Sequence, residues 1–170
     1  MENSNLVLLG MPGAGKSTLG VLLAKSLCMP FIDTDLIIQH QENRFLQEII
    51  DQEGLEGFLA IENETILSLD VKKHVIATGG SVIHSKLAME HLKSRGTLLY
   101  LQLSYQEIEK RIKNITTRGI AKNGNQSLFD LYTERVPLYV RYADMLVSCS
   151  GKEMEALVCE IQALFKNYKK

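Results

Sequence analysis

The chain has no tryptophan, few cysteines and prolines, and almost no net charge. Its 170 residues include three cysteines and three prolines, and the formal net charge is −1. Cys28, Cys149 and Cys159 are odd in number and lack C-x-x-C spacing, which argues against a disulfide framework or a zinc site and favours buried free thiols. A charge this close to zero gives no support for binding nucleic acid through bulk electrostatics.

Long apolar runs are also absent. No segment approaches the roughly 20 apolar residues that cross a bilayer, and the first residues carry no basic region of the kind that opens a signal peptide. We therefore expect a cytoplasmic protein with no membrane partner. The length and composition suit a single domain, residues 1–170, and we expect a monomer.

Short apolar runs alternate with amphipathic helical patterns along the chain. The expected strands are residues 6–9, 31–33, 75–78, 97–101 and 145–147. The expected helices lie near residues 16–27, 45–52, 55–70, 85–94, 105–113, 127–139 and 153–165. This alternation predicts an α/β fold of three layers, with a doubly wound, five-stranded parallel sheet covered by helices on both faces. Ligands of such sheets bind beyond the carboxyl ends of the strands.

The most informative motif is a phosphate loop at residues 10–17, which reads Gly-Met-Pro-Gly-Ala-Gly-Lys-Ser and matches G-x-x-x-x-G-K-[ST]. It lies between a predicted strand and a predicted helix, which is the context that the motif requires. Its backbone N–H groups and the helix start favour phosphate oxygens. Lys16 is expected to reach the β- and γ-phosphates, and the Ser17 hydroxyl to ligate Mg²⁺. The predicted nucleotide contacts are Gly13, Ala14, Gly15, Lys16, Ser17 and Thr18.

Two stretches depart from the alternation of strands and helices. Residues 35–70 read as helical with no intervening strand, so we expect a small substrate-binding insertion over the crevice. Residues 114–126 are polar and contain glycine, which is typical of a mobile lid between two helices. An ordinary surface loop is the alternative interpretation of this second stretch.

Several separated motifs support the phosphate loop. They are the D-x-D pair in residues 31–35, the turn at residues 77–80, an arginine in the predicted lid, and the R-x-P-L-Y stretch at residues 135–139. Together they resemble the shikimate kinase family, a nucleoside-monophosphate-kinase-like branch of phosphate-loop proteins, over nearly the whole chain. The resemblance implies ATP and Mg²⁺ as cofactors, and transfer of the ATP γ-phosphate to a hydroxyl of a small molecule, which is shikimate in that family.

The resemblance assigns roles to three charged side chains. It places Asp33 beside Mg²⁺ and Asp35 beside the attacking hydroxyl, where a carboxylate orients the hydroxyl and accepts its proton. A helix N-cap is the alternative role for Asp35. Arg118 matches the lid arginine that closes over the phosphates, where a cation stabilises the transferred charge. Lys16, Asp35 and Arg118 are thus the predicted catalytic residues.

The remaining assignments lie at the two ends of the site. Arg111 and Lys152 match basic positions near adenine, although each could be a solvated surface charge. Gly79 and Gly80 match a turn whose backbone approaches the acceptor, and Arg135 matches an arginine that clamps the acceptor's carboxylate through its planar fork.

The predicted acceptor end departs from the family pattern. Leu59 stands where a second carboxylate-clamping arginine is expected, and Ser81 replaces a third glycine. A leucine donates no hydrogen bond, and losing one charge-assisted bond costs about 1.5–3 kcal/mol. Leu55, Phe58, Leu59 and Glu62 share one helix face by their i, i+3, i+4, i+7 spacing.

Three hypotheses remain open at this point. The first is a shikimate kinase in which Arg135, with Arg44 or Arg141, offsets the missing clamp. The second is a kinase of another small hydroxyl compound such as homoserine. The third is a regulatory module that binds nucleotide without turnover. The complete set of phosphoryl-transfer residues argues against the third.

Overall fold

The computed structural model describes residues 4–113, 119–122 and 124–168. The elements are β1 (Asn5–Leu9), α1 (Lys16–Leu27), β2 (Phe31–Asp33), α2 (Thr34–Glu42), α3 (Leu46–Ser68), β3 (Val75–Ala77), the 3₁₀ turn η1 (Val82–His84), α4 (Lys86–Arg95), β4 (Gly96–Gln102), α5 (Tyr105–Lys113), α6 (Leu128–Tyr142), β5 (Met145–Ser148) and α7 (Met154–Asn167). All five expected strands are present, within one or two residues of their predicted ends.

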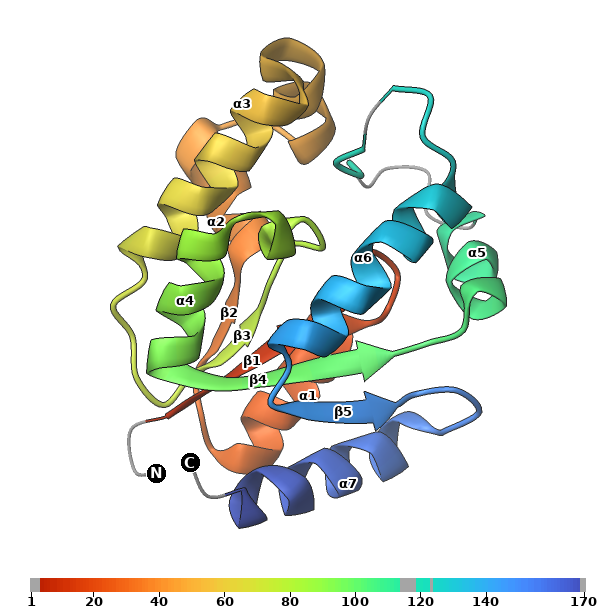
Figure 1. Cartoon of the computed structure of the whole chain (residues 1–170). Coiled ribbons are helices and arrows are strands. Elements are labelled where there is room, and N and C mark those ends of the chain that lie inside the picture. Colours follow the sequence, from red (N-terminus) through yellow and green to blue (C-terminus); the bar gives the residue numbers. More distant parts are fainter. Residues whose placement is uncertain (1–3, 114–118, 123, 169–170) are drawn as a thin grey trace.

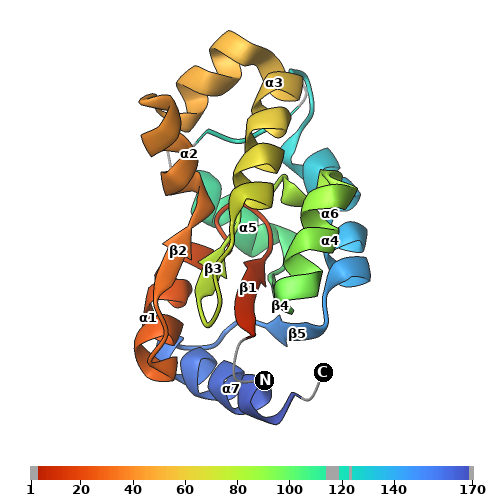
Figure 2. The same cartoon turned by 90° about the vertical axis from the view of Figure 1, so that its left-hand side faces the viewer.

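The strands form one parallel sheet in the order β2-β3-β1-β4-β5. Helices α1 and α7 pack on one face, and α4 and α6 cover the other (Figures 1 and 2). The predicted three-layer, doubly wound α/β fold is therefore confirmed. Successive strands lie on opposite sides of β1, with β2 and β3 on one side and β4 and β5 on the other. Ligands of open α/β sheets bind beyond the strand ends at such a point.

The core is centred on β1 and β4. All five residues of β1 and the first six of β4 are buried, because helices cover both faces of these central strands. The edge strand β5 instead alternates buried and exposed residues. The continuous apolar runs in the sequence thus correspond to the central strands β1 and β4. The phosphate loop follows directly after β1.

The insertion predicted at residues 35–70 consists of α2 and α3, which pack together above the sheet (Figure 1). Helix α2 was missing from the predicted helices, since its mixed composition gives no clear apolar stripe. The two helices predicted at residues 45–52 and 55–70 form one long helix, α3, which is interrupted at Gly54. Gly54 has φ 70° and ψ −178°, a conformation open to glycine and strained for other residues.

The expectation of buried thiols is right for Cys149 and wrong for Cys28 and Cys159, which are exposed. Cys28 ends α1 in the left-handed conformation at the surface, and Cys159 lies on an outward face of α7. All three thiols are free, as expected. Within the described ranges, no helix is both long and apolar enough to cross a membrane.

Candidate active site

The phosphate loop leaves the end of β1 and curls into the start of α1. Gly10, Gly13 and Gly15 all have positive φ values, at 151°, 79° and 91°. Gly15 is the N-cap residue of α1 and supplies no side-chain cap, so the first N–H groups of the helix point toward the loop. The glycines of the motif are therefore needed for the loop's backbone path, which forms a cradle for phosphate.

Lys16 is buried against this loop. It is 3% exposed, and its ammonium donates to the carbonyl oxygens of Gly10 at 2.6 Å and Met11 at 3.0 Å. These bonds keep the positive charge inside the cradle. Ser17 follows in the first turn of α1 and is partly exposed, whereas Thr18 is exposed.

The two basic residues predicted near adenine have different contacts. Arg111 on α5 points its guanidinium at the carbonyl oxygens of Gly13 and Ala14, at 3.4 and 3.5 Å. Lys152 forms an ion pair with Glu160 at 2.6 Å on the surface. The alternative interpretation as a solvated charge thus describes Lys152 in this structure, while Arg111 contacts the phosphate loop.

Sheet register brings the three segments after β1, β2 and β3 to one edge. Leu8 pairs with Ala77, and Ala77 pairs with Asp33. Two side-chain bonds then tie the segments together: the Thr78 hydroxyl donates to the Leu8 carbonyl at 3.0 Å, and the Gly79 N–H donates to the Thr34 hydroxyl at 3.2 Å. The phosphate loop, the D-x-D pair and the glycine turn therefore meet at one edge of the sheet.

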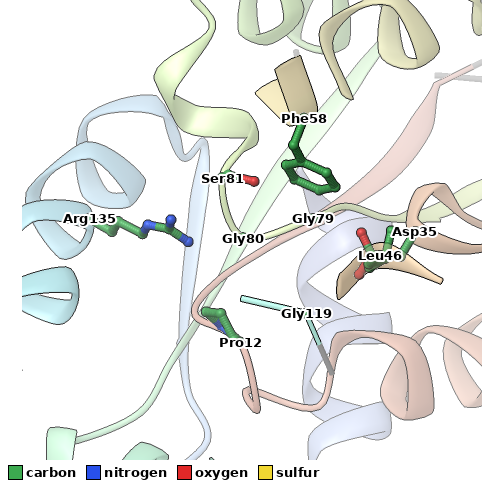
Figure 3. A pocket seen from close by; sticks show the side chains of 9 residues that line it. All are labelled: Pro12, Asp35, Leu46, Phe58, Gly79, Gly80, Ser81, Gly119 and Arg135. Carbon is green, nitrogen blue, oxygen red and sulfur yellow. The ribbon is translucent and has the colours of Figure 1, made fainter. Parts of the chain in front are cut away.

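The two aspartates have different surroundings. Asp33, not Asp35, is the N-cap of α2, and its Oδ1 accepts the Asp35 N–H at 3.0 Å. The alternative of a capping role for Asp35 is therefore wrong, because the helix begins two residues earlier than that role requires. Asp35 lies in the first turn of α2, with its side chain toward a small cavity (Figure 3).

The donor set suits Mg²⁺ that arrives with a nucleotide. No group of three or more histidine, cysteine or acidic side chains suited to a metal ion occurs in the part of the chain that the structure describes. Ser17 and Asp33 offer only oxygen atoms, and two such ligands cannot hold Mg²⁺ by themselves. Mg²⁺ commonly takes its other ligands from phosphates and water, so these residues fit the ion as part of a complex with ATP.

A cavity of about 20 Å³ lies beside the glycine turn, and we call it the inner cavity. Asp35 and Arg135 approach it from opposite sides, with Gly79 and Gly80 between them (Figure 3). The remaining residues of its wall are Pro12, Leu46, Phe58, Ser81 and Gly119. Its volume holds about one water molecule, so a metabolite requires the walls to move apart.

Both glycines of the turn are needed for close packing. A Cβ on Gly79 would clash with Oε1 of Glu62 and lie 3.0 Å from Oδ1 of Asp35. A Cβ on Gly80 would lie 2.9 Å from Cδ of Pro12 and 3.2 Å from Nη1 of Arg135. The turn therefore brings bare backbone against the side chains that are expected to hold the acceptor.

Arg135 is almost wholly enclosed, at 2% exposure. Its Nη2 donates to the carbonyl oxygen of Ala121, while its Nε is buried and has no hydrogen-bond partner among the described residues. Tyr139, one turn later on α6, donates its hydroxyl to the Gly80 carbonyl at 2.5 Å and stacks on Tyr100. These contacts hold α6 and the glycine turn together and direct the guanidinium toward the inner cavity.

Glu62 is a site residue to which the sequence assigned no role. It is 2% exposed, and its Oε1 has no hydrogen-bond partner among the described residues. Burial raises the pKa of Glu62 to about 7, and the charge of Asp35 adds to this increase. The hydrogen bond from Ser81 and the charges of Arg135 and Lys16 act in the opposite direction. The position of Glu62 on the same helix face as the apolar Phe58 was the sequence feature that could have indicated its burial.

Leu59 lies away from the inner cavity. It packs beside the small apolar cluster of the insertion and lines a second space of about 210 Å³, which we call the side cavity. Arg135 lines both cavities. Arg44 is bound to Glu42 and Glu53 at the far end of the insertion, and neither it nor Arg141 lines either cavity.

The predicted lid is described only in part. Arg118 lies outside the described residues, so its proposed role stays a prediction. Gly119 packs so closely on the start of α3 that a Cβ there would lie 2.7 Å from the Gln47 nitrogen. Ala121 is buried in the apolar cluster of the insertion. This end of the segment therefore contacts the insertion across the inner cavity.

Comparisons with known proteins agree with this geometry. The model of the family described as shikimate kinase matches residues 12–166. A shikimate kinase of Paracidovorax citrulli (strain AAC00-1) is 39% identical over 160 residues, covering 91% of this chain and 87% of that protein. A shikimate kinase of Clostridium botulinum (strain Eklund 17B / Type B) is 34% identical over 170 residues, covering 98% of this chain and 99% of that protein.

A solved structure gives the same result. A shikimate kinase from Acinetobacter baumannii in complex with shikimate has a TM-score of 0.89 at 32% identity, over 98% of this chain and 96% of that chain. Identity above 30% across almost the full length shows a relationship closer than a shared fold. The family match begins within the phosphate loop and includes the glycine turn and Arg135. The chain belongs to the shikimate kinase family.

Proposed function

We propose that this chain transfers the γ-phosphoryl group of ATP to a hydroxyl of shikimate, with Mg²⁺ bound to the nucleotide. The observation that carries the proposal is the placement of Asp35 and Arg135 on opposite walls of one cavity, beside the phosphate loop. Shikimate has a carboxylate at one end of its ring and hydroxyls at the other, so the two walls match its two kinds of group.

Each residue has a definite task in this proposal. The backbone of the phosphate loop and Lys16 bind the β- and γ-phosphates, and Ser17 and Asp33 hold Mg²⁺, which neutralises phosphate charge when bound. Asp35 orients the attacking hydroxyl and accepts its proton. Arg135 binds the carboxylate, and Arg118 reaches the transferred phosphoryl group. Arg111 flanks the base, and Lys152 does so only after leaving Glu160.

Binding of the acceptor requires the inner cavity to widen. Its present volume of about 20 Å³ is far below that of a six-membered ring with substituents. The walls that can separate are the insertion and the segment at residues 119–122, which touch through Gly119 and Ala121. We propose that they part to admit the acceptor and close again around it, which excludes water from the reaction. We also propose that the protein acts as a monomer in the cytoplasm, where ATP is available.

An ADP-release assay with purified protein tests the proposal. Shikimate should support turnover, whereas homoserine and gluconate, which lack its ring, should support little or none. Lys16→Met is the matched negative control because it removes the phosphate-binding charge. Turnover with homoserine or gluconate but not with shikimate would contradict the proposed acceptor. Nucleotide binding without turnover on any acceptor would contradict the proposed activity.

A further inference from the structure

The side cavity differs from the inner cavity in size and in lining. It measures about 210 Å³ and is lined by the apolar side chains of Leu55, Leu59 and Leu131, by the carboxylate of Glu134, and by basic and amide side chains. Arg135 forms part of both walls, and its buried Nε has no partner among the described residues. An unpartnered nitrogen on a buried cation is costly, so this wall is suited to an anionic group that enters with a ligand.

The residue that would complete a carboxylate clamp is missing from α3. Leu59 lines the side cavity at the position of the expected second arginine, and it offers only apolar surface. A second positive charge must therefore come from another element if the acceptor's carboxylate is to be held at two points. Arg44 and Arg141 line neither cavity, so they do not supply it.

Among the residues that the structure describes, two other basic side chains line the side cavity, His84 and Lys122. Burial lowers the pKa of His84, and the charge of Arg135 lowers it further against the opposing effect of Glu134, so His84 is the poorer source of positive charge. Lys122 is the other candidate. Its ammonium donates to the Gln126 carbonyl at 3.2 Å, and among the described residues it has no carboxylate partner.

We infer that Lys122 supplies the second positive charge for the carboxylate of the acceptor, in place of the arginine that Leu59 replaces. Lys122 follows the buried Ala121, whose carbonyl accepts a hydrogen bond from Arg135, so the backbone before Lys122 is tied to the first member of the clamp. The inference rests on the proposed function, because it assumes that the acceptor carries a carboxylate. It makes Lys122 a specificity residue that acts from the end of the predicted lid.

Titration calorimetry with shikimate and with its neutral carboxamide, in the presence of ADP and Mg²⁺, tests the inference. Lys122→Met should raise the Kd for shikimate by about tenfold, the value of one charge-assisted hydrogen bond at an exposed site, and leave the Kd for the carboxamide unchanged. Lys122→Arg should bind shikimate nearly as the wild type does. Lys86→Met, at an exposed lysine of α4, is the matched control and should change neither Kd.

A second-site variant sharpens the test. Leu59→Arg in the Lys122→Met background should restore shikimate binding, since it returns a cation to the same cavity. An unchanged Kd for shikimate in Lys122→Met, or an equal loss for both ligands, would overturn the inference while wild-type turnover of shikimate leaves the proposed function standing. Failure of the wild type to bind or phosphorylate shikimate would overturn the proposed function, and the inference with it.

Discussion

The nucleotide end and the acceptor end of the active site are built in different ways. The phosphate loop uses the backbone of eight consecutive residues, 10–17, and one lysine that is already bound within the loop. The acceptor end uses side chains from several elements: Asp35 from α2, Glu62 from α3 and Arg135 from α6. The phosphate loop is closed around its own lysine, whereas the acceptor end contains a cavity of only about 20 Å³. Two of its buried groups, Glu62 and Arg135, each have one atom without a hydrogen-bond partner among the described residues.

This difference shows where the two ends tolerate change. A phosphate is the same in every kinase, and a loop of N–H groups binds it without depending on side chains beyond Lys16 and Ser17. An acceptor is recognised by side chains. The presence of Leu59 in place of an arginine, and of Ser81 in place of a glycine, therefore alters the acceptor end and leaves the nucleotide end intact. We therefore expect substitutions at the nucleotide end to affect kcat most, and those at the acceptor end to affect KM for shikimate.

The largest effect is expected for Lys16→Met. Removing the cation that contacts the transferred phosphate should lower kcat by about 10²- to 10³-fold, the usual loss for one preorganised electrostatic group. Lys25→Met, an exposed position in the last turn of the same helix, is the control and should retain activity. Steady-state ADP release measures both. Near-normal kcat in Lys16→Met would show that the loop lysine is not part of the reaction.

Arg135→Lys should raise the KM for shikimate by about 10- to 100-fold and change the KM for ATP little. Lysine keeps the charge but loses the planar fork that binds a carboxylate at two points. Arg141→Lys on the same helix lies at the surface and should change neither constant. An equal rise in both KM values would mean that Arg135 supports the whole site and does not belong to the acceptor end alone.

Glu62→Gln should remove a pH dependence of stability. The pKa of this buried acid is raised to about 7 from an ordinary value of 4.5, so the folded state holds a proton that the unfolded state releases between these values. Stability therefore falls as pH rises through this window, by about 3 kcal/mol in total. Relative to wild type, Glu62→Gln should gain that amount between pH 4.5 and pH 8.

Urea unfolding at a series of pH values measures this gain. Glu56→Gln, at an exposed position of the same helix, is the control and should follow the wild type across the whole range. A constant difference between Glu62→Gln and wild type would show that the carboxylate of Glu62 is already ionised at low pH, with a cation or water compensating for its burial.

The smallest effect is expected for Leu59→Arg. The side cavity leaves room for the longer side chain, and a restored arginine should lower the KM for shikimate by up to about tenfold. The gain is limited because Leu59 also packs beside the apolar cluster of the insertion. Leu67→Arg, farther along α3 and 40% exposed, is the control. No gain in Leu59→Arg would show that the acceptor end has been rebuilt more widely than at one residue.

The fold and the nucleotide end were predictable from the sequence because both depend on local patterns. Buried parallel strands appear as continuous apolar runs, and the phosphate loop is one contiguous motif. The break in α3 was also predicted, since Gly54 separates two helical patterns. Helix α2 was covered only by the helical reading of residues 35–70 and was not predicted as a separate helix, because its mixed composition gives no clear apolar stripe.

At the acceptor end, the identity of the residues was predictable, but their packing was not. The family resemblance identified Asp35, Gly79, Gly80 and Arg135, and the structure places all four on the wall of the inner cavity. It did not indicate that Glu62 is buried against this site, or that Leu59 lines a separate cavity, because both depend on how α3 packs over the sheet. Contacts between elements far apart in the chain leave little trace in a single sequence.

We expect the phosphate loop to deliver the γ-phosphoryl group of ATP to shikimate and not to water. Phosphorus NMR of a reaction with ATP, Mg²⁺, shikimate and purified protein tests this expectation. We predict one phosphate monoester for each ADP formed, with no ester when shikimate is omitted. Formation of ADP and inorganic phosphate without the ester, at a rate independent of shikimate, would contradict it.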